Sequence, residues 1–225
     1  MNYLQVRFTN DTKMEAGVDE AGRGCLWGPL YAAAVIWPRE EDWLDEHKEL
    51  APKIKDSKKI SAKKRKQIAE QIKASAIDYG IGSVSAQEID QVGMTYANRL
   101  AFQRALEGLS VPVERVLLDG CLPLKEEQLE MLKIEQQETI VEGDGTYLPI
   151  AAASILAKEG RDSVVEEWVS KEPELQTVYN IGSCKGYGTE KHRNAIKEKG
   201  MHPEHRRLFL RKLLNLRMND CLLSE

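Results

Sequence analysis

Short apolar runs alternate with longer amphipathic segments along most of the 225 residues, and this alternation leaves few fold classes open. A run of about 4–8 apolar residues is typical of a buried strand, whereas apolar residues that recur every three or four positions are typical of a helix. Strands that alternate with helices predict an α/β domain with a central sheet. We expect strands at residues 14–20, 29–37, 79–84, 115–119 and 138–141, helices at 61–77, 85–109, 150–171, 189–199 and 204–219, and a charged loop with a short helix at 39–56.

Local signals predict where several helices begin and end. Ser61 is a suitable N-cap for the first long helix, and Ser85 with Glu88 has the pattern of a capping box. Gly93 lies where the helix after this box is expected to divide into two. Gly200 is expected to end the basic helix that precedes it.

The composition excludes several classes of protein. Hydrophobic residues make up 42% of the chain, which is enough to build a core and excludes a disordered protein. The longest apolar stretches, 30–37 and 150–157, fall well short of the roughly 20 residues that a bilayer requires, so we expect no membrane partner. The four cysteines form no Cys-x-x-Cys pair, which predicts neither a disulfide framework nor a zinc site. We therefore expect a cytoplasmic protein, or a nuclear one in a eukaryote.

The net charge of −4 conceals two strongly basic segments. Residues 53–73 carry nine Lys and Arg side chains against Asp56 and Glu70, and residues 185–217 carry ten against three glutamates. Each segment has a charge of +7, so the rest of the chain has a charge of −18. Such surfaces fit a polyanion like nucleic acid, although a lysine-rich helix is also common as a plain solvated face.

Acidic residues stand where the expected strands end. Asp19 and Glu20 follow an apolar run and precede a glycine-rich turn that is expected to end the strand. Asp119 ends a second strand, and Asp144 lies between two glycines shortly before the helix at 150–171. Taken singly, each position fits turn or capping chemistry, because Asp beside Gly is common in turns. Gathered in one cleft, four carboxylates would repel one another and raise one another's pKa unless cations joined them.

The types of these side chains indicate which cations would fit. Carboxylate oxygens without His or Cys nearby favour Mg²⁺ or Mn²⁺ over zinc. Two such ions about 4 Å apart are a common arrangement for phosphodiester hydrolysis, in which one activates the attacking water and the other stabilises the leaving oxygen. The acids therefore predict a two-ion hydrolase site, provided that folding brings them together.

The opening motif of the chain closely resembles that of ribonuclease HII, the type 2 ribonuclease H. Residues 17–24 read Gly-Val-Asp-Glu-Ala-Gly-Arg-Gly and are followed by Gly28-Pro29 and an alanine-rich run at 32–35. The resemblance extends from about residue 15 to residue 210, and seven motifs in the family's order are far more specific than any one of them. The other six are Asp56-Ser57-Lys58-Lys59, Leu118-Asp119-Gly120, Gly143-Asp144, residues 150–158 with Arg161-Asp162, Lys185-Gly186-Tyr187-Gly188-Thr189, and Pro203 with His205-Arg206.

The resemblance implies an RNase H-like fold, in which helices flank a central mixed sheet. It implies a single catalytic domain over residues 1–225, with a basic helical extension at 185–225. The implied activity is endonucleolytic cleavage of RNA in RNA–DNA hybrids and cleavage 5′ of single ribonucleotides embedded in duplex DNA, leaving 3′-hydroxyl and 5′-phosphate ends. The implied cofactors are two Mg²⁺ or Mn²⁺ ions, and we expect a monomer.

The resemblance also implies roles for individual residues. The catalytic metal ligands would be four acids: Asp19, Glu20, Asp119 and Asp144. The substrate-binding residues would be Gly22, Arg23 and Gly24 at the ribonucleotide 2′-hydroxyl and its phosphate, Lys58 on the backbone, and Tyr187 against the nucleotide at the RNA–DNA junction. Glycines suit such a loop because their amides can approach the strand without a Cβ in the way.

Three departures from the family pattern stand out. Cys184 replaces a common His, Leu208 replaces a common Ser, and residues 39–55 look longer and more acidic than the usual connection. Neither substitution touches a proposed metal ligand, so we expect catalysis to persist. Any effect of Cys184 is expected on substrate affinity near Tyr187.

Other interpretations fit the sequence less well. The glycine spacing at 22–28 is not that of a dinucleotide-binding loop, and Ser154 with His205 lacks the pattern of a hydrolase triad. The alternative that stays open is an inactive or partner-dependent nucleic-acid-binding subunit on the same fold. We interpret the other polar residues structurally: Ser154 as a packing residue, Arg161 and Asp162 as an ion pair or helix contact, and His192, His202 and His205 as phosphate contacts or caps.

Overall fold

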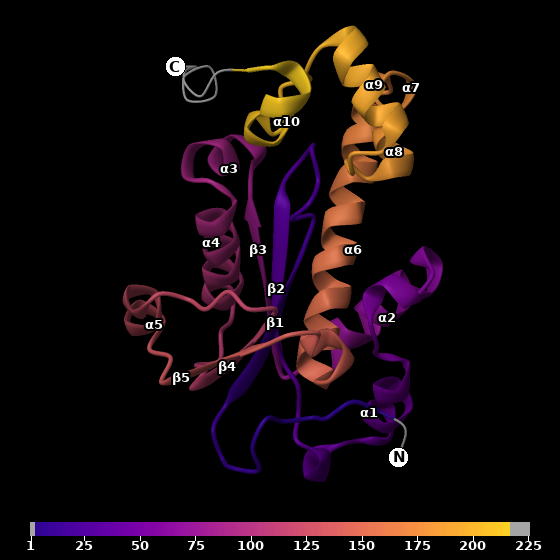
Figure 1. Cartoon of the computed structure of the whole chain (residues 1–225). Coiled ribbons are helices and arrows are strands. Elements are labelled where there is room, and N and C mark those ends of the chain that lie inside the picture. The colour runs from indigo at the N-terminus through magenta and orange to yellow at the C-terminus, as the bar shows by residue number, and fades with distance from the viewer. Residues whose placement is uncertain (1–2, 217–225) are drawn as a thin grey trace. The chain divides into compact units, whose positions relative to one another are not determined.

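The computed structural model describes residues 3–216, and its strands form one five-stranded sheet in the order β3-β2-β1-β4-β5 (Figure 1). Strand β1 pairs antiparallel with β2 and parallel with β4, and β4 pairs parallel with β5. This arrangement confirms the expected central mixed sheet. The strands are β1 (Glu15–Ala21), β2 (Leu30–Ile36), β3 (Asp78–Val84), β4 (Arg115–Asp119) and β5 (Gln136–Ile140).

Helices fill the connections between the strands and form the C-terminal part of the described chain. The α-helices are α1 (Asp45–Leu50), α2 (Ala62–Ser75), α3 (Ala86–Val92), α4 (Met94–Glu107), α5 (Glu126–Leu132), α6 (Leu148–Lys171), α7 (Glu174–Thr177), α8 (Ile181–Cys184), α9 (Glu190–Lys199) and α10 (Arg207–Leu214). Short 3-10 turns are η1 (Glu40–Asp42), η2 (Ala51–Lys53), η3 (Ser57–Lys59) and η4 (Gly143–Gly145). None of the helices within residues 3–216 is long and apolar enough to cross a membrane.

The local signals predict most of these boundaries correctly. Ser85 and Glu88 form the expected capping box, and Gly93, with φ of 77°, separates α3 from α4. The last helix ends earlier than expected, at Leu214, and residues 217–219 of that prediction lie outside the described residues. Helix α5 was not expected, because it has only seven residues and the pair Leu129 and Leu132 is too short a pattern to predict a helix.

The described residues divide into two compact units. The first comprises residues 3–21, 31–83 and 99–159 and holds nearly the whole sheet. The second comprises residues 22–30, 84–98 and 160–216 and holds α3 and α7 to α10.

Helices cover both faces of the sheet in the first unit. Figure 1 shows α4 and α5 on one side of the strands and α1, α2 and α6 on the other. Because both faces are covered, the alanines at 32–34 in β2 are fully buried, as expected for a strand packed closely on both sides. The core against α2 and α6 includes Val35, Ile68, Ile72 and Leu156.

Gly17 allows β1 to pack directly against the start of α6. A Cβ at position 17 would lie 2.3 Å from the backbone nitrogen of Ile150 and 2.3 Å from the carbonyl carbon of Pro149. We predict that Gly17→Ala lowers the free energy of unfolding by about 1–3 kcal/mol, because backbone atoms cannot move aside without shifting the helix. Urea denaturation measures this loss. Gly145→Ala is the control, since a Cβ there meets nothing within 4 Å, and an equal loss in both variants would contradict the prediction.

The second unit has its own core around Trp27, which is fully buried. Val165 of α6, Ile196 of α9 and Leu210 of α10 pack in the same cluster. The Asp90 carboxylate of α3 accepts hydrogen bonds from the backbone N–H groups of Arg207 (2.8 Å) and Leu208 (3.0 Å), which fixes the start of α10.

Candidate active site

Carboxylates gather in the first unit at the ends of three neighbouring parallel strands. Val18 of β1 pairs with Leu118 of β4, so Asp19 and Asp119 continue the two strands side by side. Asp144 lies in η4, which follows β5, the next strand of the sheet. The carboxyl ends of parallel strands are the usual place for a ligand site in an α/β sheet.

Hydrogen bonds fix the segment that carries Asp144 onto Asp119. The Asp119 Oδ1 atom accepts the backbone N–H of Gly143 at 2.8 Å and that of Asp144 at 3.4 Å. A Cβ at position 143 would lie 3.2 Å from the same Oδ1 atom and 2.7 Å from the side chain of Ile150. Glycine at 143 therefore allows the chain to approach Asp119 closely.

The charges of these carboxylates act on one another. Asp19 is only 6% exposed, and this burial raises its pKa well above the ordinary value, with the charges of Glu20 and Asp119 raising it further. Burial also raises the pKa of Asp144, and the charge of Asp119 adds to the effect. The negative charges thus concentrate in one place, and a cation bound there would relieve their repulsion.

The environment of Glu20 differs from the expectation. Strand β1 does not end at the two acids but runs to Ala21, which pairs with Tyr31 of β2. Alternation along a strand therefore places Glu20 on the opposite face of β1 from Asp19, at the end of the strand. Within residues 3–216, no group of three or more His, Cys, Asp or Glu side chains stands in an arrangement that could hold a metal ion.

Asp19 has a buried serine partner, Ser154, that was expected only to pack. Ser154 of α6 hydrogen-bonds the Asp19 carboxylate, which lowers the pKa of Asp19 and opposes the effect of burial. The Ser154 hydroxyl lies 2.9 Å from the hydroxyl of Ser57 in η3. Ser154 is thus a polar partner of a proposed ligand and not only a packing residue. Its position on the buried face of an alanine-rich helix was the available signal.

Lys58 lies close enough to the acids to act on their charge. It belongs to η3, whose N-cap Asp56 accepts the backbone N–H of Lys58 at 2.9 Å. The positive charges of Lys58 and Lys59 lower the pKa of Asp144, against the larger effect of its burial. In the first unit, Asp119 therefore acts on the charge of both Asp19 and Asp144, and Lys58 acts on that of Asp144.

The other predicted residues lie in the second unit, where an exposed turn carries Arg23 and Gly24. The Cys25 N–H bonds the Gly22 carbonyl at 3.2 Å, which closes the turn. Gly22 has φ of 90°, a conformation that favours glycine. For the N–H of Gly24, no hydrogen-bond partner is found among residues 3–216.

Two fully buried arginines hold this turn by their guanidinium groups. Arg206 donates from Nη1 to the carbonyls of Gly22 (2.8 Å) and Arg23 (3.1 Å), and from Nε to that of Gly28 (2.9 Å). A Cβ at position 22 would lie 2.1 Å from the Arg161 Nε atom. The turn therefore rests against two buried cations whose fork geometry fixes several carbonyls at once.

Arg161 joins the turn to the segment that carries Tyr187. Its guanidinium donates to the carbonyls of Trp27 (3.1 Å), Pro29 (3.0 Å) and Lys185 (2.7 Å). The sequence predicted an ion pair or a helix contact for Arg161, whereas these hydrogen bonds join it to the backbone of two loops. Cys25 and Tyr187 form a β-bridge, and the Tyr187 side chain is 42% exposed. In the second unit, Arg23, Gly24 and Tyr187 therefore lie on two loops that Arg161 and the Cys25–Tyr187 bridge join to each other.

The comparison with known families decides the identity of this arrangement. The family model described as Ribonuclease HII matches residues 16–213, which is most of the chain. The chain belongs to the ribonuclease HII family. The expected resemblance is thereby confirmed.

Ribonuclease HII relatives cover nearly the whole chain. That of Synechococcus sp. (strain RCC307) is 45% identical over 195 residues, which is 87% of this chain and 90% of the relative. That of Prochlorococcus marinus (strain NATL1A) is 41% identical over 88% of this chain and 94% of the relative. The crystal structure of the ribonuclease H2 from Pyrococcus horikoshii OT3 matches with a TM-score of 0.68 and 25% identity, covering 89% of this chain and 97% of that chain.

Membership of the ribonuclease HII family establishes the class of activity. The chain is a ribonuclease H, an endoribonuclease that acts on RNA–DNA hybrids, as expected from the motifs. The structural match confirms the RNase H-like fold, with its mixed sheet between helices.

The two substitutions that depart from the ribonuclease HII pattern, at Cys184 and Leu208, lie in the second unit. Cys184 is buried, and its Sγ atom lies 3.8 Å from Nδ1 of His192. Leu208 lies in the first turn of α10, where its N–H bonds Asp90. His192 and His205 are also buried, so the interpretation of these two histidines as phosphate contacts is wrong.

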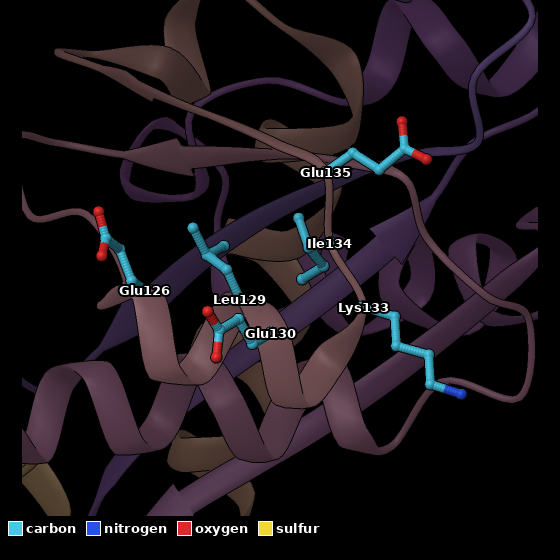
Figure 2. A pocket seen from close by; sticks show the side chains of 6 residues that line it. All are labelled: Glu126, Leu129, Glu130, Lys133, Ile134 and Glu135. Atoms are coloured by element: carbon cyan, nitrogen blue, oxygen red, sulfur yellow. The ribbon is translucent and has the colours of Figure 1, made fainter.

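A separate pocket of about 400 Å³ on the first unit does not belong to this site. It is lined by Glu126, Leu129, Glu130, Lys133, Ile134 and Glu135 (Figure 2). Figure 2 shows Glu135 on the far side of the pocket from Glu126 and Glu130. None of the residues expected to act in a ribonuclease HII lines it, so we assign it no part in the reaction.

Proposed function

We propose that this ribonuclease HII also cuts duplex DNA on the 5′ side of a single embedded ribonucleotide, leaving 3′-hydroxyl and 5′-phosphate ends. The proposal includes two-ion hydrolysis, with Asp19, Glu20, Asp119 and Asp144 as the ligands. The observation that carries it is the mutual repulsion of carboxylates at the ends of β1, β4 and β5, because such a concentration of charge is useful chiefly to bind cations.

The donor set fits Mg²⁺ or Mn²⁺. All four proposed ligands offer carboxylate oxygens, which these hard cations prefer. Such ions, when bound, lower the pKa of the attacking water and neutralise charge on the leaving oxygen. Asp119 is held by the N–H groups of Gly143 and Asp144, so its orientation is set by the fold before any ion arrives.

Selection of the ribonucleotide is proposed for the turn at 22–24 and for Tyr187. The exposed Gly24 offers an N–H to an incoming oxygen, and the exposed Arg23 offers a cation to a phosphate. The 2′-hydroxyl is the group that distinguishes RNA from DNA at one position. The exposed ring of Tyr187 offers a surface on which the next nucleotide can pack.

The basic segment of the first unit supports a second part of the proposal, which is contact with the phosphate backbone. A groove of about 1230 Å³ runs along η2, η3 and α2. Its basic lining residues are Lys53, Lys55, Lys59, Lys64 and Lys66. Lys58 is exposed beside this groove and acts on the charge of Asp144, so it is placed to contact a phosphate near the acids.

Substrate affinity is therefore expected to fall steeply as salt rises, because bound lysines release counterions from the nucleic acid. Lys58→Ala should weaken binding equally for all sequences and lower the slope of log affinity against log salt by about one. Binding measured by fluorescence anisotropy over a salt series tests this. Lys48→Ala on α1 is the control, since Lys48 is exposed and paired with Asp45. An affinity independent of salt would contradict the contact.

The proposal also includes three properties of the whole protein. We propose that the two units act as one catalytic domain, that the protein is monomeric, and that it is cytoplasmic. The cysteines at 25, 121 and 184 are free, which supports a reduced compartment. Light scattering after gel filtration tests the monomer.

The experiment that tests the proposed function uses three duplexes of one sequence. One is a continuous RNA–DNA hybrid, one contains a single ribonucleotide, and one is all DNA. We expect cleavage of the first two only when Mg²⁺ or Mn²⁺ is present, and mapping should place the cut of the second at the phosphate 5′ of the ribonucleotide. A cut 3′ of the ribonucleotide, or cleavage of plain DNA, would contradict the proposal.

A further inference from the structure

Two buried histidines of the second unit connect the turn at His202 to the backbone of Tyr187. His192 is 0% exposed and His205 is 2% exposed. Their Nε2 atoms lie 2.9 Å apart. At one end, His205 Nδ1 lies 2.8 Å from the backbone nitrogen of His202, and at the other, His192 Nδ1 lies 2.9 Å from the carbonyl oxygen of Tyr187.

These contacts fix the tautomer of each ring. The backbone N–H of His202 is always a donor, so Nδ1 of His205 must be the acceptor and carry no proton. The proton of neutral His205 is then on Nε2, which donates to Nε2 of His192. His192 must therefore carry its proton on Nδ1, which donates to the carbonyl of Tyr187. The result is a directed chain of three hydrogen bonds that ends at Tyr187.

We propose that the His205–His192 pair is a positioning device for Tyr187, and that it orients the turn at 185–189 for contact with the RNA–DNA junction only while both rings are neutral. This inference rests on the proposed function of Tyr187 as the residue that packs on the junction nucleotide. Neither histidine touches substrate in this account, so both are positioning residues.

A further proton on either ring would break the chain. At His205 it would sit on Nδ1 and face the N–H of His202, and at His192 it would sit on Nε2 and face the N–H of His205. Burial lowers the pKa of His192, and burial together with the neighbouring rings lowers that of His205 to about 3. Both rings are therefore neutral at neutral pH, as the hydrogen bonds require.

The groups around the pair are mostly uncharged. Two charged groups near these residues have other partners: the Arg206 guanidinium donates to the carbonyls at 22, 23 and 28, and the Glu172 carboxylate lies 3.0 Å from Nε2 of His202. Four titratable groups lie on the elements packed around the pair. The Cys184 Sγ atom of α8 lies 3.8 Å from Nδ1 of His192, and the Tyr179 ring centroid lies 5.1 Å from that of His205. The other two are His202, whose ring also neighbours that of His205, and Cys25, which forms a β-bridge with Tyr187. None of these supplies an anion in contact with either ring of the pair that would favour protonation.

The first test reads the tautomers directly by long-range ¹H–¹⁵N NMR of the uniformly labelled protein. We expect His205 as the Nε2–H form and His192 as the Nδ1–H form, both still neutral at about pH 6. His47 in the first unit is an internal reference, because Nδ1 accepts from Leu44 N–H and Nε2 bonds the Ser75 carbonyl, which requires the Nε2–H form. The opposite tautomers in the pair, or protonation near pH 6.5, would overturn the inference.

The low pKa of both rings also predicts the direction of a stability change. The unfolded chain binds protons at these histidines below about pH 6.5, whereas in the folded chain the pKa of His205 is lowered to about 3 and that of His192 is lowered by burial. Their contribution to stability is therefore fully present above about pH 6.5 and is lost as the pH falls toward the folded values. Replacing His205 by Leu should flatten the fall of Tm with acid, and an unchanged pH dependence would count against buried neutral rings.

The second test separates positioning from mere packing. We expect His192→Leu to lower kcat/KM on a single-ribonucleotide duplex by about tenfold, the factor expected for one lost hydrogen bond, and to leave cleavage of a continuous hybrid nearly unchanged. His192→Asn, whose amide can still donate to the Tyr187 carbonyl, should recover most of the loss. His47→Leu is the matched control, since it removes another buried ring with two hydrogen bonds, from the other unit.

Equal losses on both substrates in His192→Leu would overturn the positioning role, because a purely structural histidine would affect both. No recovery in His192→Asn would overturn it as well. Failure of the proposed function itself appears separately, as a wild-type enzyme that leaves the single-ribonucleotide duplex uncut. That outcome also overturns the positioning role, whereas the NMR test of the two tautomers does not depend on it.

Discussion

Asp119→Asn is expected to lower cleavage of an RNA–DNA hybrid by at least about a thousandfold and to leave the fold intact. The change keeps the shape of the side chain but removes one negative charge from the proposed cation site. Metal ions contribute several kcal/mol of charge stabilisation to such reactions, and each 1.36 kcal/mol is a factor of ten in rate. The measurement is a single-turnover cleavage assay in Mg²⁺.

A melting curve without metal checks that this loss is not a failure to fold. Because the charge of Asp119 raises the pKa of both Asp19 and Asp144, its removal relieves repulsion, and Tm should be equal to or above that of the wild type. Asp45→Asn on α1 is a matched control at an exposed site and should cleave at the wild-type rate. A near wild-type rate for Asp119→Asn would show that the metal site lies elsewhere.

Tyr187→Ala is expected to slow cleavage of a single-ribonucleotide duplex at least about tenfold more than cleavage of a continuous hybrid. Stacking of an aromatic ring on a base contributes about 1–3 kcal/mol, and a lone ribonucleotide offers the junction as its only recognition feature. A continuous hybrid offers many alternative registers, so it depends less on one junction. The measurement is kcat/KM on both substrates under identical conditions.

Tyr187→Phe is the control for this comparison, because it retains the ring and removes only the hydroxyl. It should cleave both substrates at rates close to those of the wild type. If Tyr187→Ala lost the same factor on both substrates, Tyr187 would have a general role in binding and not a role in reading the junction.

Much of the fold could be predicted because its signals are local. The alanines at 32–34 indicate a strand covered on both faces, and Gly93 with its positive φ divides two helices at the position where the sequence places it. Helix α5 could not be predicted in this way. It has only seven residues, and its apolar pair Leu129 and Leu132 is too short a pattern to indicate a helix.

The acids could be proposed from sequence because each ends or follows a strand, and parallel strands end at the same edge of a sheet. Ser57 and Ser154 could not, because the 2.9 Å contact between their hydroxyls joins residues 97 positions apart. Only the approach of η3 to α6 brings the Ser57 hydroxyl to that of Ser154, which bonds Asp19. The continuation of β1 through Glu20 likewise depends on pairing with β2, which its own sequence does not reveal.

The basic residues of the second unit show the same limit more clearly. The Lys and Arg side chains of residues 185–217 predicted a surface for a polyanion, yet Arg206 in this segment is fully buried, as is Arg161 of α6. Both guanidinium groups donate to backbone carbonyls, and most of these carbonyls are more than a hundred residues away in the sequence. Every residue has a backbone carbonyl, so no sequence pattern marks such a partner. The composition therefore predicted the positive charge of this region, but not that Arg161 and Arg206 bond backbone carbonyls inside the protein.

The most direct test of the account is a crystal structure of the chain with Mn²⁺ and an uncleavable single-ribonucleotide duplex, with anomalous scattering used to locate manganese. Two anomalous peaks are expected in contact with carboxylate oxygens of Asp19, Glu20, Asp119 and Asp144, beside the phosphate on the 5′ side of the ribonucleotide. Manganese found only at other residues, or a scissile phosphate remote from these four acids, would contradict it.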